Sequence, residues 1–493
     1  MEFIAYIILI LLGLAILATL VRAALFRPKK TAVPPLPPEE VDTGRAAAHL
    51  SAAIQIPTIS YLEDDRVDWA QFRRFHAFLE ESYPLLHRTL TREVIDKASL
   101  LYTWPGSDPA LSPIALLSHQ DVVPISAGTE DDWTHPPFSG HNDGEMIWGR
   151  GAMDMKNHLV AVMEAVETLL AEGFRPARTV HLCFGHNEEV VGSDHAGASA
   201  IMETLRDRGV RLESVIDEGG AMFPIHVKKI LNSTLAGIGI SEKGYVSFEI
   251  SIQRKGGHSA QPPKHTALGE LAEVIRDLER HPFRAKMLPF LTSLLDEAGR
   301  RVPYCLRLVT CNHKLLRPVI TGILQNIPAA ASMMRTTTAV TMAQGSPADN
   351  VLPQKASVVV NFRQMPGTSA ADVERHIRRV VRNKDIHIAA LKQKEASPFS
   401  PTDSRAFQVI RDLVLTEHPE AIVAPYLVMG GTDACFYEPI CDNVYRFSPF
   451  LTDLFLLFCT HATNERLPAE TMGQAVSFFK RYIRTLCVSE ITE

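Results

Sequence analysis

The order of apolar and polar positions predicts a chain in which strands alternate with helices. Short apolar runs that end at polar residues are typical of buried strands, and apolar residues three or four apart are typical of one helix face. The predicted strands are 100–104, 114–118, 179–184 and 214–216, and the predicted helices are 44–54, 69–81, 155–172 and 196–208. This alternation predicts an α/β fold with a largely parallel sheet covered by helices on both faces.

A second pattern begins after residue 242. The predicted elements are strand 245–253, helix 268–280, strands 335–342 and 357–362, helix 370–382 and strand 386–391. This β-α-β-β-α-β order is that of a small ferredoxin-like unit. An apolar insertion at about 281–334 separates its first helix from its second strand, and the α/β pattern resumes near residue 398. The smaller unit therefore interrupts the larger one.

The first residues predict a membrane anchor. Phe3 to Val21 is an uncharged apolar run of 19 residues, which is long enough to cross a bilayer as a helix. Glu2 precedes the run and basic residues follow it, whereas a cleaved signal peptide carries its basic residues in front. We therefore expect a retained single-pass anchor rather than a signal peptide. Taken literally, the positive-inside rule places the basic flank in the cytoplasm, but one segment leaves the side of the catalytic domain open.

These patterns divide the chain into five predicted segments. They are a transmembrane anchor at 1–22, a Pro-rich spacer at 23–40, the first part of a catalytic domain at 41–242, a lid or dimerisation domain at 243–397, and the second part of the catalytic domain at 398–493. A length of 493 residues fits this division, because a single core stops growing well below that size.

Charge and cysteine usage exclude some function classes. The formal net charge is −6 and no basic tract interrupts the body of the chain, so nucleic-acid binding is not expected. The seven cysteines include no Cys-x-x-Cys pair, which argues against a structural zinc knuckle or a thioredoxin-like redox site.

Potential metal ligands gather where predicted strands end. In largely parallel sheets, ligands bind at the carboxyl ends of the strands. His119, Asp121, Glu188, Glu189 and Asp217 all follow such strands, Asp154 precedes a predicted helix, and His461 lies near the C-terminus. Imidazole and carboxylate are zinc ligands, and a two-metal site needs about five or six of them. Taken singly, each has a simpler interpretation: His119 as a core histidine, Asp154 as a helix N-cap, and Asp217 as a turn residue.

The pair Glu188-Glu189 is the most informative feature of this set. Adjacent side chains at a strand-to-loop turn can diverge, so one carboxylate can bind a metal while its neighbour removes a proton from the attacking water. A solvated acidic turn is the alternative for any such pair taken alone.

Seven motifs occur in the order seen in one enzyme family. They are SHQDVVP at 118–124, GRGAMDMK at 149–156, NEEVVG at 187–192, VIDEG at 215–219, GGHSA at 256–260, NFR at 361–363 and GGTD at 430–433. Together they resemble the co-catalytic zinc peptidases of the aminoacylase, carboxypeptidase G and carboxypeptidase S family. SEKG at 241–244, RTTTA at 335–339 and the long insertion are most similar to the branch of carboxypeptidase S and the N-fatty-acyl-amino-acid synthase/hydrolase.

The resemblance implies a role for each candidate residue. It implies two zinc ions bound by His119, Asp154, Glu189, Asp217 and His461, with Asp154 bridging. It implies that Asp121 tunes His119, that Glu188 is the general base, and that His258 stabilises the oxyanion, in some relatives from the partner subunit of a homodimer. It implies that Arg363, Asn350, Gly430 and Thr432 hold the substrate carboxylate.

We therefore expect a membrane-anchored dizinc amidohydrolase that cleaves, and under suitable concentrations forms, the amide bond of an N-acyl amino acid. The acyl group is expected to be a fatty chain. A carboxypeptidase or dipeptidase acting on short peptides is the alternative enzyme, and a metal-free binding or scaffold protein is the alternative from another class.

Overall fold

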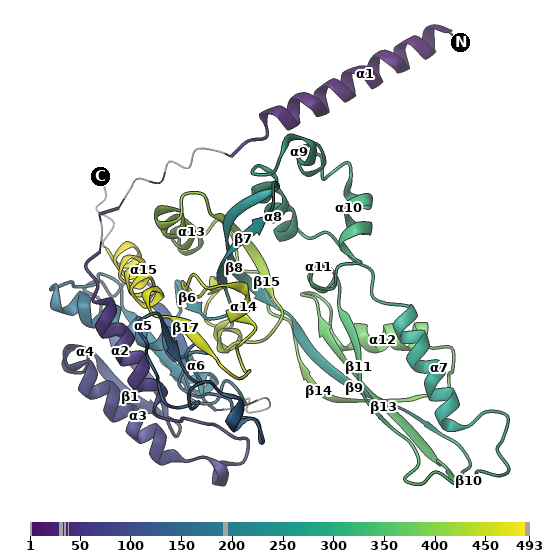
Figure 1. Cartoon of the computed structure of the whole chain (residues 1–493), viewed down its shortest axis with the longest axis horizontal. Coiled ribbons are helices and arrows are strands. Elements are labelled where there is room, and N and C mark those ends of the chain that lie inside the picture. Colours follow the sequence, from purple (N-terminus) through teal and green to yellow (C-terminus); the bar gives the residue numbers. More distant parts are fainter. Residues whose placement is uncertain (1, 29–32, 34–35, 38, 191–195, 489–493) are drawn as a thin grey trace.

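The computed structural model describes residues 2–28, 33, 36–37, 39–190 and 196–488. Part of the predicted spacer and the last two residues of the NEEVVG motif lie outside these described residues. Figure 1 shows a broad α/β body, a narrower extension built on a second sheet, and one long helix that leaves the molecule at its N-terminus.

The body contains a nine-stranded sheet, which includes the four strands that the alternating pattern predicts. Eight strands follow one another in the order β1 (Thr91–Ile95), β2 (Ser99–Trp104), β5 (Val180–Gly185), β3 (Ile114–His119), β6 (Ser214–Asp217), β16 (Val444–Arg446), β8 (Leu231–Glu242) and β15 (Ile422–Val428). The ninth strand, β7 (Ala221–Val227), pairs with β8. The central strand β3 is parallel to β5 and β6, and β15 is parallel to β8. The prediction of a largely parallel sheet is confirmed.

Both faces of this sheet are covered, because β3 is buried along its whole length. Leu116 packs in the cluster that includes α5 (Lys156–Ala171), whereas its neighbours Ala115 and Leu117 pack in the cluster that includes α6 (Ala198–Asp207). Helices α2 (Thr43–Ile54) and α15 (Glu470–Cys487) lie against α5. Alternate residues of one apolar strand therefore serve two separate layers.

The remaining elements of the body border this core. They are α3 (Trp69–Ser82), α4 (Pro84–Thr89), α13 (Arg405–Glu417), α14 (Leu454–Leu457), β4 (Met146–Trp148) and β17 (Arg466–Pro468).

The second sheet is antiparallel and has four strands. Its order is β11 (Thr337–Gln344), β13 (Lys355–Gln364), β9 (Gly244–Gln253) and β14 (His387–Lys394). Helices α7 (Ala267–Arg280) and α12 (Ala370–Val380) share its apolar core. Only Lys243 separates β8 of the large sheet from β9 of the small one, so a nearly continuous strand joins the two sheets.

The apolar insertion folds into four helices: α8 (Pro289–Gly299), α9 (Tyr304–Thr310), α10 (Arg317–Leu324) and α11 (Pro328–Ser332). Although the insertion interrupts the small unit in sequence, its buried residues Phe290, Leu291 and Ile320 belong to the same core cluster as the large sheet. Helix α8 packs against the edge strand β15. The insertion therefore packs against the body, although it lies within the chain segment that forms the second sheet.

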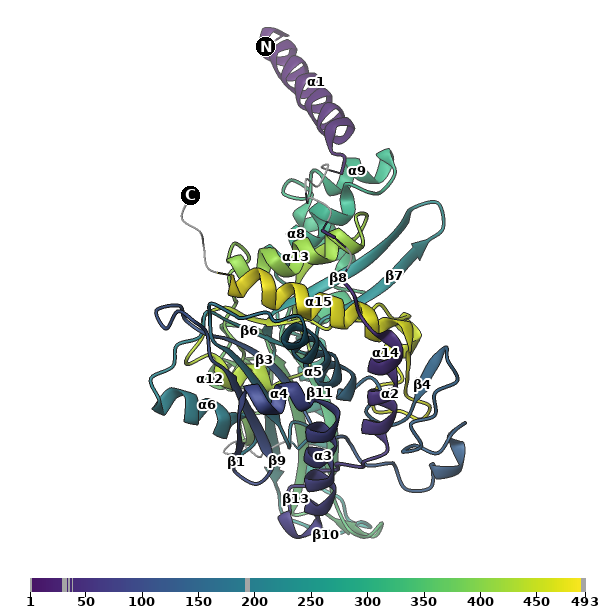
Figure 2. The same cartoon turned by 90° about the vertical axis from the view of Figure 1, so that its left-hand side faces the viewer.

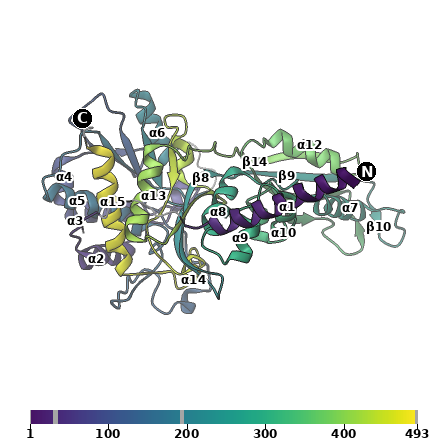
Figure 3. The ribbon, with the colours of Figure 1, turned by 90° about the horizontal axis from the view of Figure 1, so that it is seen from above.

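Helix α1 (Glu2–Leu25) projects from the rest of the molecule and contacts α9 near its C-terminal end. Its segment Phe3–Leu25 has a mean hydropathy of 2.9 and is long and apolar enough to cross a membrane. Seen from the side, α1 projects away from the body beyond α9 (Figure 2), and in the view from above it is drawn across the insertion helices and the second sheet (Figure 3).

Candidate functional site

The carboxyl edge of the large sheet brings together side chains that are far apart in sequence. His119 is the last residue of β3, Glu188 and Glu189 lie in the turn after β5, and Glu218 follows β6. Ligand atoms of His119, Glu188 and Glu218 lie within 4.8 Å of one another, and so do those of His119, Asp154 and Glu189. His119 is shared by both groups, so the two groups form one cluster.

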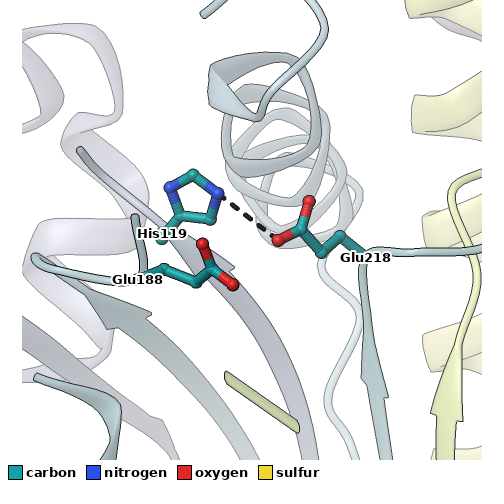
Figure 4. A group of neighbouring side chains, drawn as sticks. All are labelled: His119, Glu188 and Glu218. Carbon is teal, nitrogen blue, oxygen red and sulfur yellow. Dashed lines mark ion pairs between the residues drawn. The ribbon is translucent and has the colours of Figure 1, made fainter. Parts of the chain in front are cut away.

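His119 directs one ring nitrogen into this cluster. Its Nε2 atom lies 3.1 Å from Asp154 Oδ1 and 3.4 Å from Glu218 Oε1. Figure 4 shows the carboxylates of Glu188 and Glu218 near each other on one side of the imidazole, with the ion pair between His119 and Glu218 drawn as a dashed line. His119 is buried, but its ring nitrogens face the carboxylates of Asp121, Asp154 and Glu218, so it belongs to an acidic cluster and not to an apolar core.

Asp154 connects His119 to the C-terminal histidine. Its second oxygen, Oδ2, lies 3.0 Å from His461 Nε2, and the same nitrogen lies 2.9 Å from Glu189 Oε1. The N-cap of the following helix α5 is Met155, with no side-chain cap, so Asp154 does not cap that helix. One carboxylate thus faces two imidazoles from opposite sides.

Asp121 fixes both His119 and the Glu188-Glu189 turn. The Nδ1 atom of His119 lies 2.9 Å from the Asp121 backbone carbonyl oxygen and 3.4 Å from its Oδ1. The two carboxylate oxygens of Asp121 accept hydrogen bonds from the backbone N–H groups of Glu188, at 3.1 Å, and Glu189, at 3.2 Å. A single buried side chain therefore orients the imidazole and the adjacent carboxylate pair.

Glu465 performs the same task for the loop that carries Asp154, and the sequence prediction does not include it. Its Oε1 atom accepts hydrogen bonds from the backbone N–H groups of Gly151, Met153 and Asp154 at 3.0, 2.8 and 3.2 Å. Its Oε2 atom accepts one from Arg150 at 2.6 Å, and Arg150 also donates to the carbonyl oxygen of His461. The available signal was its place four residues after His461, next to a predicted ligand.

Asp217 is the predicted ligand that the structure places outside the cluster. Its Oδ2 atom accepts a hydrogen bond of 2.8 Å from the backbone N–H of Ala434. The next residue, Glu218, directs its carboxylate at His119 instead. Successive residues at a strand end point to opposite sides, so an assignment by motif alone is easily wrong by one position. In this structure the carboxylate that faces His119 is therefore that of Glu218, whereas that of the expected ligand Asp217 faces Ala434.

The cluster has an excess of negative charge. Burial and the nearby charge of Glu218 raise the pKa of Glu188 well above its usual range. Hydrogen bonds with Asp154 and Glu189 raise the pKa of His461 to about 10. Four carboxylates facing two imidazoles form a donor set of the kind that divalent zinc accepts, and the bound cations would neutralise the mutual repulsion of the acids. The residues present therefore fit a metal centre.

The GGTD loop, residues 430–433, lies beside this centre and is anchored by hydrogen bonds to Glu242 at the end of β8. Thr432 Oγ1 donates a hydrogen bond of 2.7 Å to Glu242, whose other oxygen accepts from the Thr432 backbone N–H. A side chain added at Gly431 would lie 3.1 Å from Lys394 Nζ, whereas Gly430 has open space. The loop is thus fixed at its Thr432 end and open at its Gly430 end.

Arg363, on β13, lies at the joint between the two sheets. It pairs with Tyr245, the second residue of β9, and its guanidinium lies 4.9 Å from the centre of the Tyr245 ring. Its positive charge is close enough to Lys243 that it contributes, after burial, to lowering the pKa of Lys243 to about 8. Two positively charged side chains, Arg363 and Lys243, therefore lie at this joint between the sheets.

His258 and Asn350 lie elsewhere. His258, on β10 (Gly257–His258), pairs with Val351 of β12 (Val351–Leu352), and Ser259 N–H donates to the Asn350 carbonyl oxygen. Both residues are exposed, and β10 lies at the far tip of the second sheet, remote from β6 and β17 (Figures 1 and 2). The expected contact of these two residues with the cluster is absent within the described single chain.

Comparisons with known proteins agree with this geometry. The model of Peptidase family M20/M25/M40 matches residues 115–485. The chain is 35% identical to "Probable carboxypeptidase S-like 2" of Dictyostelium discoideum, covering 93% of this chain and 89% of that one. It is 31% identical to an N-fatty-acyl-amino acid synthase/hydrolase of Homo sapiens, with 88% and 86% covered. It is 33% identical to Carboxypeptidase S of Saccharomyces cerevisiae, with 88% and 83% covered.

Solved structures share the fold. An M20 family metallo-carboxypeptidase from Sulfolobus solfataricus superposes with a TM-score of 0.63 at 15% identity, over 90% of this chain and 99% of that chain. Human carnosine dipeptidase 1 superposes with a TM-score of 0.58 at 16% identity, over 90% and 97%. From the match over most of its length and the acidic histidine cluster, the chain belongs to peptidase family M20/M25/M40 and is a metal-dependent peptidase or amidohydrolase.

Proposed function

We propose that this protein is a dizinc amidohydrolase that cleaves N-fatty-acyl amino acids with a free carboxylate. The observation that carries the proposal is a pair of exposed aromatic side chains that shortly precede His461, a residue of the cluster, in the chain. Phe455 is 64% exposed and Phe458 is 75% exposed, and they lie six and three residues before His461. Large apolar side chains at the rim of a polar site suit a substrate whose acyl part is apolar.

The two zinc ions would share Asp154. His119 and Glu218 would hold one ion, and His461 and Glu189 the other, because these pairs lie on opposite sides of the Asp154 carboxylate. Glu218 replaces Asp217 in this assignment. When bound, such ions supply Lewis acidity and lower the pKa of water.

Glu188 would act as the general base. Its carboxylate lies in the cluster, and Asp121 anchors its backbone, so the side chain starts from a fixed position. Glu188 would remove one proton from the water that attacks the amide carbon and then deliver that proton to the leaving amine. The amine nitrogen becomes the amino group of the released amino acid, and the water oxygen becomes part of the released carboxylate.

The substrate carboxylate would bind at the joint between the sheets. Arg363 offers a planar guanidinium that donates two parallel hydrogen bonds to a carboxylate. The open Gly430 end of the GGTD loop and Thr432 would form the opposite wall. Lys243 donates to the carbonyl oxygens of Ser332 and Arg335, at 2.9 and 3.0 Å, and would add positive charge at the same place.

His258 and Asn350 would complete the site from a second copy of the chain. They lie together where the short strands β10 and β12 pair, so a homodimer that seats this exposed strand pair at the partner's cluster would deliver both at once. His258 would then stabilise the negative charge that develops on the amide oxygen.

Helix α1 would anchor the enzyme as a single membrane span. Its segment Phe3–Leu25 has the length and hydropathy of a transmembrane helix, and basic residues follow it. The anchor would place the enzyme where amphiphilic substrates concentrate.

A carboxypeptidase acting on short peptides is the second candidate, because two of the relatives above are named carboxypeptidase S or carboxypeptidase S-like. The same metals and base would serve either substrate. The two functions differ only in what lies on the acyl side.

The test compares hydrolysis of N-oleoyl-phenylalanine and of an N-blocked dipeptide by the purified full-length protein, with zinc content measured on the same sample. We expect bound zinc and faster cleavage of the oleoyl substrate. Faster peptide cleavage would favour the carboxypeptidase, and absence of both zinc and turnover would favour a binding protein.

A variant pair tests the acyl side directly. Joint replacement Phe455→Ser and Phe458→Ser should lower kcat/KM for N-oleoyl-phenylalanine about tenfold relative to N-acetyl-phenylalanine, which corresponds to about 1.4 kcal/mol of lost apolar burial. Val94→Ser, at another exposed apolar position (49% exposed) on edge strand β1, is the control. Equal losses on both substrates would contradict an acyl-chain role for these aromatic residues.

A further inference from the structure

The outer face of the insertion carries an apolar stripe that the proposed reaction does not use. Leu315, Val319, Ile323 and Ile327 recur every four residues along α10 and its flanks. Their side chains are 74%, 59%, 61% and 49% exposed, respectively. Residues four apart share one face of a helix, so Val319 and Ile323 lie on the same face of α10, and Leu315 and Ile327 flank the helix before its start and after its end.

The opposite face of the same helix is also apolar. Ile320 is buried in the core of the large sheet, and Leu316 and Leu324 pack partly buried against that core. A surface helix in water normally has one apolar and one polar face, whereas a helix that is apolar all round is typical of burial on every side. The exposed strip therefore indicates a second apolar environment outside the protein.

Contacts with α1 indicate what that environment is. Tyr304 on α9 donates a hydrogen bond of 3.1 Å to the carbonyl oxygen of Leu20, and Arg307 donates one of 3.3 Å to that of Phe26. Arg300 donates to the carbonyl oxygen of Arg27 and lies over the Phe26 ring at 4.4 Å. Helix α9 therefore holds the end at which the anchor would leave the bilayer, so the insertion lies at the bilayer surface.

The charge of the insertion suits anionic headgroups. Residues 298–348 contain no Asp or Glu, but they include basic residues close to the stripe, notably Lys314 and Arg317, both of which are exposed. Arg22 and Arg27 at the end of α1 are exposed as well. Exposed apolar residues flanked by Lys and Arg are the composition of helices that lie in the membrane interface.

We propose that α9 and α10 lie in the headgroup layer of the bilayer that α1 crosses, with the stripe Leu315, Val319, Ile323 and Ile327 among the upper acyl chains. The inference rests on the anchor role of α1 in the proposed function. It adds that the enzyme has a second, monotopic membrane contact, so the body is held at a fixed height and orientation over the lipid instead of swinging on its spacer.

The experiment measures depth by fluorescence quenching. Full-length Ile323→Trp protein is reconstituted in nanodiscs whose phospholipids carry bromine near the top of the acyl chains, and the signal of the native protein is subtracted. The four native tryptophans all lie within residues 69–148 of the body, far in sequence from the insertion. Leu12→Trp in α1 is the positive control. Val351→Trp, exposed at the end of the molecule opposite α1, is the negative control.

We expect brominated lipid to quench the added emission of Ile323→Trp to an extent comparable with that of Leu12→Trp, and to leave that of Val351→Trp unchanged. If Ile323→Trp does not fold, Val319→Trp on the same stripe replaces it. Quenching of Leu12→Trp without quenching at position 323 or 319 would overturn the proposal while the anchor stands.

Two further outcomes are distinguishable. Absence of quenching at all three positions would overturn the anchor and this proposal together, whereas the hydrolysis and zinc measurements would still decide the proposed reaction. A change in the emission of Ile323→Trp that follows protein concentration and not bromination would assign the stripe to a second copy of the chain, and would equally overturn the membrane contact.

Discussion

At the carboxyl edge of the large sheet, Asp121 accepts two backbone N–H groups and Glu465 accepts three, and together they fix the turns that carry Glu188, Glu189 and Asp154. At the tip of the small sheet, His258 is exposed, and its Nδ1 atom accepts only the nearby N–H of Ala260. The first region is held by its own fold before any ligand binds. Among the described residues the second region has no comparable set of buried hydrogen bonds, which fits the proposed role of His258 across a homodimer.

In the proposed function, this difference separates two kinds of catalytic residue. Groups that bind metal and transfer protons need a constant geometry. Buried carboxylates that accept hydrogen bonds from backbone N–H groups hold the surrounding turns in that geometry. A residue that serves a partner must remain on the surface until the two copies meet. Mutations in the two regions should therefore fail in different ways.

The largest expected effect comes from replacing Glu188, the proposed general base of the buried region. Glu188→Gln should lower kcat by about 10²–10⁴-fold, because an amide cannot take the proton of the attacking water. Zinc content should stay unchanged, since four other ligands and His119 remain, and His461→Ala should lose metal instead. Turnover and elemental analysis measure the two effects, and Glu81→Gln on the surface of α3 is the control. Retained turnover in Glu188→Gln would remove the assigned base.

The next effect tests the exposed region. His258→Ala should lower kcat by about 10²–10³-fold, the loss typical of a missing oxyanion donor. Mixing it with Glu188→Gln under conditions of subunit exchange should restore up to about a quarter of wild-type activity, because half of the dimers are then mixed and each has one complete site. No recovery on mixing, with dimers demonstrably exchanged, would show that His258 does not act across an interface.

A smaller effect distinguishes which of two adjacent residues in the buried region, Asp217 or Glu218, binds zinc. Glu218→Gln should weaken zinc binding by at least about 10–100-fold, the loss already seen when a group that merely supports a ligand is removed. Asp217→Asn should keep its zinc, because an amide oxygen can still accept the Ala434 N–H. Metal titration against a chelator measures both. Loss of zinc in Asp217→Asn alone would return the ligand role to Asp217.

The smallest effect concerns stability and applies only to the body. Burial lowers the pKa of His181, on β5, to about 4. The unfolded ring, with a pKa of about 6.5, binds a proton as the pH falls and the folded ring does not, so stability is lost between about pH 6.5 and pH 4. The fall in Tm from pH 7 to pH 5 should be smaller in His181→Asn by about 2–4 °C.

The exposed His226→Asn provides the matched control for that measurement. Equal Tm losses in wild type, His181→Asn and His226→Asn would mean that protonation of the buried ring does not contribute to acid sensitivity.

Much of the fold followed from sequence because its signals are local. The apolar run 114–118 predicts a buried strand, and β3 covers it with one further residue; helices α2, α3, α5 and α7 agree with their predicted ranges to within one residue at each end. The hairpin formed by β7 and β8 was not predicted. Strand β8 alternates only weakly and continues directly into β9, so no turn signal marks where one sheet ends and the other begins.

Sequence by itself determined which residue types reach the site. The ends of apolar strands, the Glu188-Glu189 pair and the seven ordered motifs specify a carboxylate and histidine centre in an α/β body, because strand ends and motif spacing are local properties. The apolar insertion could likewise be recognised from its amino-acid composition.

Only the tertiary structure decided how these residues meet. The choice between Asp217 and Glu218 depends on which way adjacent side chains leave a strand. The role of Glu465 depends on loops some three hundred residues apart in sequence. The separation of His258 from the cluster depends on the distance between two sheets. Each of these is a relation between segments remote along the chain, and such relations are set by packing, which leaves no pattern within any one segment.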